Sequence, residues 1–185
     1  MAVIDLSGFV SQLKDHLVEH DFHIHEEKHF IESYSLMQSW SIYLHPDDAC
    51  NGPMDLKVSL SVGARELLSF EDKVSTVEDA ELGQFPLEVN FEWKLPPIKE
   101  GVDTLVLALD LTRFGDLDFP VEVGIRHEYK TVTDQPHRHL VVRATHDFSL
   151  NQIYLGEEFP CKCIIKAMEV SRHLLAQSSQ WLTSP

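Results

Sequence analysis

The most constraining feature of this chain is a series of segments in which apolar and polar residues alternate strictly. The clearest covers residues 87–95, where every second residue is apolar. A period of two places the apolar side chains on one face of a strand and the polar side chains on the other. A sheet of such strands is buried on one face, so a separate layer must cover that face. The polar positions of this segment are Glu88, Asn90, Glu92 and Lys94.

Other segments extend the same pattern into a sheet. Residues 39–44, 56–62, 121–125 and 139–144 also alternate, and residues 104–111 are apolar on both faces, which predicts a central strand. Turn residues such as His45-Pro46-Asp47-Asp48 separate several of them. Short connections join antiparallel strands. The sequence therefore predicts an antiparallel sheet of six to eight strands.

Two segments near the ends of the chain have the spacing of amphipathic helices. Apolar residues recur every three or four positions over about 6–20, and again over about 161–181 after Pro160. Two such helices can cover the apolar face of the predicted sheet. We therefore expect an α+β fold in which residues 1–185 form a single globular domain.

The charge distribution limits the partners that the chain can bind. The net charge is −15, and it lies in the first two thirds, since residues 1–120 hold 23 Asp and Glu against eight Lys and Arg. Residues 121–185 hold seven of each kind. Nucleic acids and anionic membranes attract basic proteins, so neither is an expected partner. A basic protein partner is the expectation that fits an acidic surface.

The cysteine content and the N-terminus point to a compartment. Three cysteines, Cys50, Cys161 and Cys163, are too few and odd in number for a disulfide scaffold. The N-terminus has no basic segment followed by an apolar run, which argues against a secretory signal. We expect a cytoplasmic protein.

These observations favour a binding protein without enzymatic activity or cofactor. The acids of the alternating strands would lie on the exposed face of the sheet and meet a basic partner there, as in adaptors, inhibitors of the immunity type or chaperone-like subunits. The residues expected to contact the partner are Glu88, Glu92, Asp116 and Asp118.

A histidine-rich segment supports an alternative, enzymatic function. His25-Glu26-Glu27-Lys28-His29 resembles the His-Glu-x-x-His zinc-binding helix of the zincin metallopeptidases. That resemblance implies that His25 and His29 bind Zn²⁺ and that Glu26 is the general base of a hydrolase. The residues just before it, Phe22 to His25, alternate as in a strand. Neighbouring acids also allow the five histidines of this region to titrate near neutral pH on an association surface. These are His16, His20, His23, His25 and His29.

A third function is compatible with the aromatic residues of the predicted strands. A curled sheet closed by the C-terminal helix can hold a small molecule in an apolar cavity. The residues expected to line that cavity are Trp40, Phe91 and Trp93. The same side chains would otherwise belong to an ordinary core.

Overall fold

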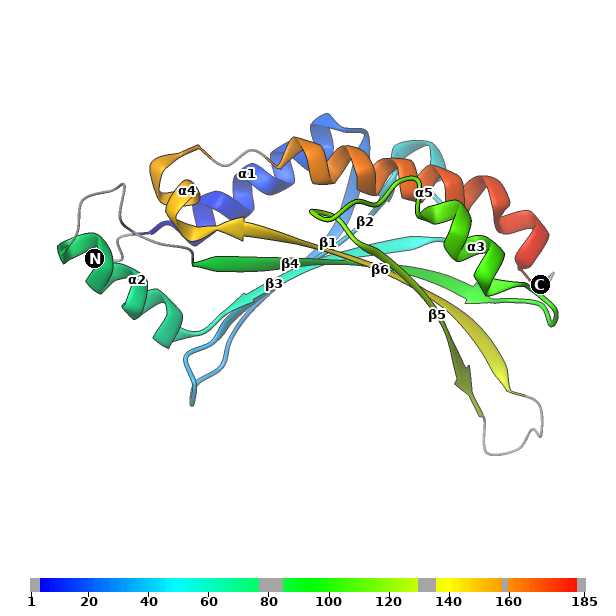
Figure 1. Ribbon diagram of the computed structural model, residues 1–185, viewed down its shortest axis with the longest axis horizontal. Coiled ribbons are helices and arrows are strands. Elements are labelled where there is room, and N and C mark those ends of the chain that lie inside the picture. The colour runs from blue at the N-terminus through cyan, green and yellow to red at the C-terminus, as the bar shows by residue number, and fades with distance from the viewer. Residues whose placement is uncertain (1–3, 77–84, 130–135, 158–159, 183–185) are drawn as a thin grey trace.

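The computed structural model describes residues 4–76, 85–129, 136–157 and 160–182, and its centre is one antiparallel sheet (Figure 1). The order of the six strands in the sheet is β1-β2-β3-β4-β6-β5. All neighbouring strands are antiparallel. The strands are β1 (Phe22–Ile31), β2 (Gln38–Pro46), β3 (Asp55–Val62), β4 (Pro86–Pro97), β5 (Val121–Glu128) and β6 (His137–Ser149).

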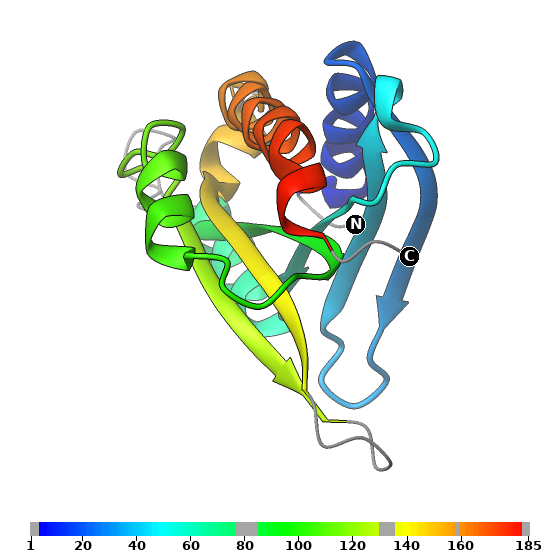
Figure 2. The same cartoon turned by 90° about the vertical axis from the view of Figure 1, so that its right-hand side faces the viewer.

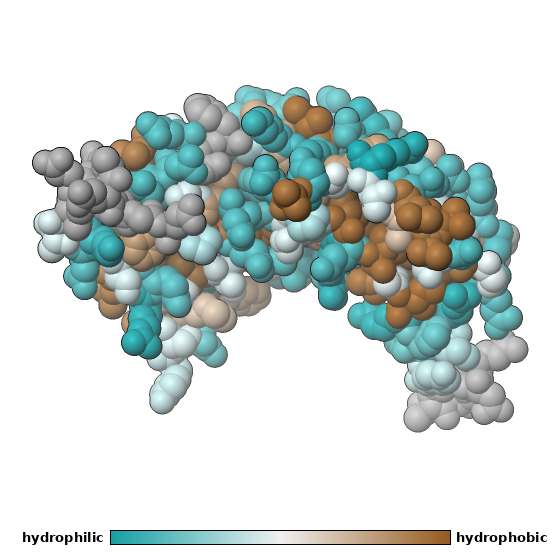
Figure 3. Space-filling model, in the orientation of Figure 1, coloured by the Kyte–Doolittle hydropathy of each residue, from teal (hydrophilic) through white to brown (hydrophobic). Residues whose placement is uncertain are grey.

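The two terminal helices, α1 and α5, form the second layer. They lie beside each other over one face of the sheet, as Figures 1 and 2 show from perpendicular directions. The other face arches away and is hollow in the space-filling view, and none of the described elements covers it (Figure 3). The helices are α1 (Leu6–Glu19), α2 (Ala64–Thr76), α3 (Thr104–Leu111), α4 (Leu150–Leu155) and α5 (Cys161–Trp181), with a 3₁₀ turn, η1 (Asp47–Ala49).

This architecture confirms the predicted α+β class, the antiparallel sheet and both terminal helices. Within the described ranges, no helix combines the length and the apolar composition needed to cross a bilayer. Local sequence explains where the terminal helices begin. Asp5 precedes α1, and its side chain accepts a hydrogen bond from the Gly8 amide, which satisfies one of the unpaired groups at the helix start. Pro160 precedes α5 at a position where a missing N–H costs nothing.

The core lies between the covered face of the sheet and the two long helices. Alternate residues of β2, β3 and β4 are buried there, and α1 contributes one apolar stripe. Trp40, Phe91 and Trp93 belong to this core, and the rings of Phe91 and Trp93 lie 6.4 Å apart. They are packed against other core residues, so their burial has a structural explanation that does not require a ligand. The small-molecule hypothesis stays a prediction.

One polar contact crosses this core. The indole Nε1 of Trp93 on β4 donates a hydrogen bond of 2.8 Å to Ser171 Oγ on α5, and both side chains are buried. The Ser171 hydroxyl in turn donates to the Ala167 carbonyl one helical turn earlier. Every polar atom of this contact is therefore satisfied, and the contact fixes where α5 lies on the sheet.

The prediction of a central strand at residues 104–111 is wrong, because this segment is helix α3. Asp103 caps the helix by accepting hydrogen bonds from the amides of Leu105 and Val106. A short apolar run does not distinguish a strand from a helix by periodicity. Leu and Ala are strong helix formers, and the segment has few β-branched residues, so propensity and the cap together favour the helix.

Residues 71–83 form a segment rich in acids, and the structure describes only part of it. Its first residues belong to α2, which runs to Thr76 and buries Phe70. Residues 77–83 lie outside the described ranges. Residues Arg65 to Phe70, whose pattern fits either a helical turn or a strand, belong to the same helix.

The Trp93–Ser171 contact gives a prediction about stability. Ser171→Ala leaves the buried indole N–H without an acceptor, which we expect to lower the free energy of unfolding by about 1–3 kcal/mol. Chemical denaturation followed by far-UV circular dichroism measures this loss. Ser178→Ala is the matched control, because Ser178 also lies on α5 but donates to the Leu175 carbonyl of its own helix. Equal losses in the two variants would contradict the importance of the contact.

His173 on α5, which contacts Arg113 just after α3, gives a pH dependence. Arg113 Nη2 donates to His173 Nδ1 at 3.0 Å. Burial lowers the pKa of His173 below its ordinary value of 6.5, the Arg113 charge lowers it further, and Asp110 opposes the shift. As the pH falls, His173 therefore takes up a proton in the unfolded chain before it does so in the folded chain. The free energy of unfolding decreases until the pH reaches the lower pKa of the folded state.

We expect the unfolding free energy to decrease between pH 7.5 and pH 5.5, and the decrease to be smaller in His173→Gln, where this group no longer titrates. Denaturation curves at the two pH values measure both. An unchanged or larger decrease in the variant would contradict the assignment to His173.

Candidate functional site

Five side chains that bind metals well gather at one end of the uncovered face of the sheet. They come from four consecutive pieces of the chain: β1, the end of β2, the turn after η1, and the start of β3. Each side chain is exposed or half-buried, so solvent and ions can reach the group. The residues are His23, His25, His45, Cys50 and Asp55.

Strand register brings the histidines together. His23 lies directly opposite His45 across the β1–β2 pair, on the uncovered face, because Phe22 and Ile24 point to the core side. The register shifts between Ile24 and Glu26, so His25 is the extra residue of a β-bulge. A bulge re-aims the side chain at that position. The rings of both His23 and His25 stack on the ring of His45, at centroid distances of 5.2 and 5.3 Å.

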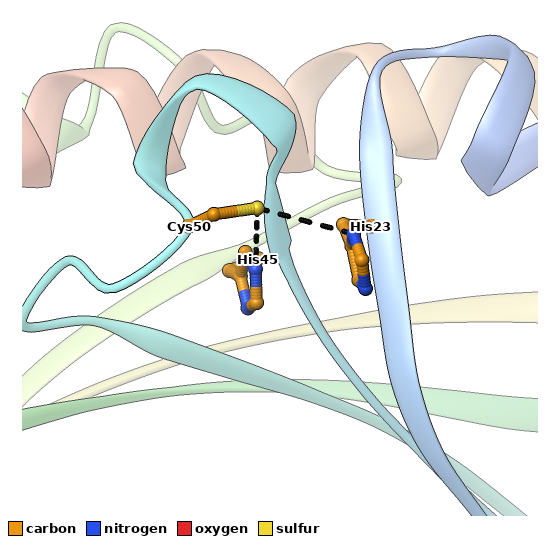
Figure 4. Close-up of side chains that lie close together, drawn as sticks. All are labelled: His23, His45 and Cys50. Atoms are coloured by element: carbon orange, nitrogen blue, oxygen red, sulfur yellow. Dashed lines mark hydrogen bonds between the residues drawn. The ribbon is translucent and has the colours of Figure 1, made fainter.

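The cysteine completes a compact group with two of these rings. Cys50 Sγ lies 3.2 Å from His45 Nε2 and 3.9 Å from His23 Nδ1, and the close-up shows the thiol directed at both rings (Figure 4). Cys50 is a free cysteine. His25, the second ring that stacks on His45, donates from Nε2 to Asp55 Oδ1 at 2.9 Å.

The distances suit a single metal ion. One ligand atom from each of His23, His45 and Cys50 lies within 4.8 Å of the other two, and the same holds for His25, His45 and Asp55. Tetrahedral Zn²⁺ with bonds of about 2.0 Å to nitrogen and about 2.3 Å to sulfur needs nitrogen and sulfur about 3.5 Å apart. The two sulfur–nitrogen distances, 3.2 and 3.9 Å, lie on either side of that value.

Electrostatics favour the neutral, ligating form of the central ring. Burial lowers the pKa of His45 below 6.5, and the charges of His25 and His23 lower it further. Asp55 and Asp47 act in the opposite direction with smaller effect. Three adjacent imidazoles repel one another when protonated, whereas a neutral ring can bind a cation through its free lone pair.

The structure does not bring together the residues of the zincin-like motif. His25, Glu26 and His29 lie on strand β1, whereas the resemblance requires a helix. His29 stacks on Trp40 at a centroid distance of 4.2 Å, far along the strand from the bulge, and Glu26 forms an ion pair with Lys28 at 2.9 Å. Of the three residues, only His25 is part of the histidine–cysteine group.

The four acids predicted to meet a partner do not share one surface. Glu88 and Glu92 lie on the uncovered face of β4, where Glu92 is 3.5 Å from Arg143. Asp116 pairs with Lys166 of α5, and this hydrogen bond lowers the pKa of Asp116. The Asp118 carbonyl accepts from His146 Nδ1. The last two acids are therefore on the helix side of the sheet.

The uncovered face also carries more positive charge than the sequence pattern suggests. In the register of the sheet, Lys57 lies opposite Glu92, and Glu92 lies opposite Arg143 on its other side. Lys28 and Lys94 both approach the ring of Tyr43, at 4.8 and 5.2 Å. Acids and bases thus alternate across this face.

Sequence reasoning missed His45, Cys50 and Asp55 as members of a site. Their spacing matches no standard ligand motif, and their proximity to His23 depends on which residues pair across β1 and β2. One signal was present: two histidines two residues apart on one predicted strand, and a third at the end of the next. A hairpin places those positions at the same end of the sheet.

Comparison of the chain with models of known protein families, with curated proteins and with solved structures gave no match.

Proposed function

We propose that this protein binds a divalent transition metal, with Zn²⁺ preferred, through His23, His45 and Cys50. The observation that supports this proposal is the convergence of two imidazole nitrogens and a thiol, from three separate segments, at distances close to those of a tetrahedral site. Nitrogen and sulfur ligands of this kind suit Zn²⁺, whereas Mg²⁺ and Ca²⁺ prefer oxygen ligands.

Two further residues with ligating groups, His25 and Asp55, lie next to this proposed site. His25 and Asp55 are hydrogen-bonded to each other beside His45. Either side chain can supply a fourth ligand or hold a water molecule that does so. Carboxylates bonded to histidines are typical neighbours of zinc sites, where they orient the ring and raise its basicity. The five residues thus supply both the direct ligands and the neighbouring groups that orient them.

The exposure of the ligands favours a site that exchanges its metal or its fourth ligand. Structural zinc sites are closed by four protein ligands, and their domains often depend on the metal to fold. Here His23 and Cys50 are exposed, and the fold has a continuous apolar core between sheet and helices. The metal would therefore serve binding or chemistry at an open coordination position rather than hold the fold together.

Metal titration tests the proposal. We expect the tag-free protein to bind one equivalent of Zn²⁺ in isothermal titration calorimetry, and His45→Ala and Cys50→Ser to weaken binding by at least about tenfold, since each removes one ligand. His29→Ala is the matched control, because His29 belongs to the same strand but stacks on Trp40. Binding that survives in the His45 and Cys50 variants, or that disappears in the His29 variant, would contradict the site.

A chelator experiment separates this site from a structural one. With EDTA the protein should remain folded by circular dichroism, because the apolar core does not include the ligands. Added Zn²⁺ should raise the melting temperature by mass action alone. Unfolding on chelation would instead indicate a structural metal.

A second function, binding of a basic protein partner without catalysis, is favoured by one further observation. Glu88 lies directly opposite Asp147 on the uncovered face, and both side chains are exposed. Like charges opposite each other on neighbouring strands repel. A lysine or arginine from a partner would relieve this repulsion and be steered there by the net charge of −15.

A cationic peptide tests this second function. We expect a decalysine peptide to bind in fluorescence anisotropy at low salt and to lose affinity as the screening length falls to about 8 Å at physiological salt. Glu88→Gln combined with Asp147→Asn should weaken binding more than Asp116→Asn combined with Asp118→Asn, although each pair removes two charges. Equal effects would show that net charge alone, and not this face, attracts the peptide.

A further inference from the structure

The two edges of the sheet differ in how they are protected. Among the described residues, β1 pairs only with β2 and β5 only with β6, so each has one edge without a strand neighbour. β1 has a bulge at His25 and a charged run around Glu26, Glu27 and Lys28, which are common devices against edge-to-edge pairing. β5 pairs with β6 without a register shift over all its residues. The edge of β5 is therefore the one suited to accept another strand.

A helix with exposed leucines accompanies this edge. α3 packs against β5 and buries Leu107 and Leu111. On its outer side Leu105 is 66% exposed and Leu109 is 63% exposed, one helical turn apart. The space-filling view shows the resulting apolar patch over α3 (Figure 3). A patch of this kind next to an unpaired strand is typical of an interaction surface.

We propose that β5 pairs with β5 of a second copy of this chain, antiparallel and centred on Gly124, so that the two sheets become one. The sequence of β5 is complementary to itself in this register. Glu122 of each copy lies opposite Arg126 of the other, and Val123 lies opposite Ile125. A two-fold axis repeats both pairs, as a symmetric dimer requires.

Neighbouring registers are less favourable. Facing residues of an antiparallel pair share a face of the sheet, so only shifts by two residues keep the helices of both copies on the same side. Centring the pair on Ile125 places Glu122 opposite Glu128, which sets like charges against each other. Centring it on Val123 places Glu122 opposite Gly124, which forms no charge pair. Of these three registers, the one centred on Gly124 is the one in which Glu122 faces Arg126.

The apolar patch fits the same arrangement. Because α3 packs on β5, both copies of α3 lie over the new junction, with Leu105 and Leu109 available to contact the second copy. Strand pairing then supplies the backbone hydrogen bonds, and α3 supplies the apolar area that a short strand pair lacks. This proposal does not depend on the metal site, which lies near the opposite edge of the sheet.

Charge reversal tests the register. In sedimentation equilibrium with EDTA present, we expect the wild-type protein to form dimers as its concentration rises. Glu122→Arg alone and Arg126→Glu alone each place like charges opposite each other twice, and each should raise the dimer Kd by at least about tenfold. An equimolar mixture of the two variants should recover the dimer, because every facing pair is then of opposite charge. A chain with both substitutions should also recover it.

Folding controls keep the result interpretable. Both exposed positions are remote from the core, so circular dichroism and melting temperature should stay unchanged. Leu109→Glu should independently weaken the dimer if α3 contributes. A wild-type protein that remains monomeric at all concentrations, or single variants that dimerise as strongly as wild type, would overturn the proposal. Dimers lost in the variants but not recovered in the mixture would overturn the register.

Discussion

The fold depends on burying one face of a strongly curved sheet beneath two helices. Every central strand directs alternate side chains toward that layer, and the Trp93–Ser171 hydrogen bond joins sheet and helix inside it. Because the described elements cover one face alone, the remaining side chains of the same strands face solvent in a fixed register. The proposed functions of the uncovered face follow from this division, since the metal ligands and the Glu88–Asp147 pair all lie there.

The proposed metal site lies at an irregularity in the sheet. His25 is the extra residue of the bulge in β1, and its ring stacks on the ring of His45, as the ring of His23 does. The bulge also twists the edge of β1 and protects it from pairing. The bulge thus lies beside the proposed site at one edge of the sheet, whereas β5 at the other edge has no such irregularity.

The distribution of charge is more local than the net charge implies. The uncovered face alternates acids and bases around Glu92, while Asp116 is bound to Lys166 on the helix side. Ion pairs of this kind neutralise part of the negative charge within the molecule. The feature that favours a basic partner is then one pair of facing acids, Glu88 and Asp147, and not a uniformly acidic surface.

The sequence by itself determined the α+β class, the antiparallel sheet, both terminal helices and the buried positions of β2, β3 and β4, because periodicities of 2 and 3.6 record burial directly. It did not determine α3, because an eight-residue apolar run fits either element and the Asp103 cap decides. It identified His25 but paired it with His29, four residues along the chain. Only the tertiary structure placed His25 beside His45, Cys50 and Asp55, because the pairing of β1, β2 and β3 brings together residues that no local pattern connects.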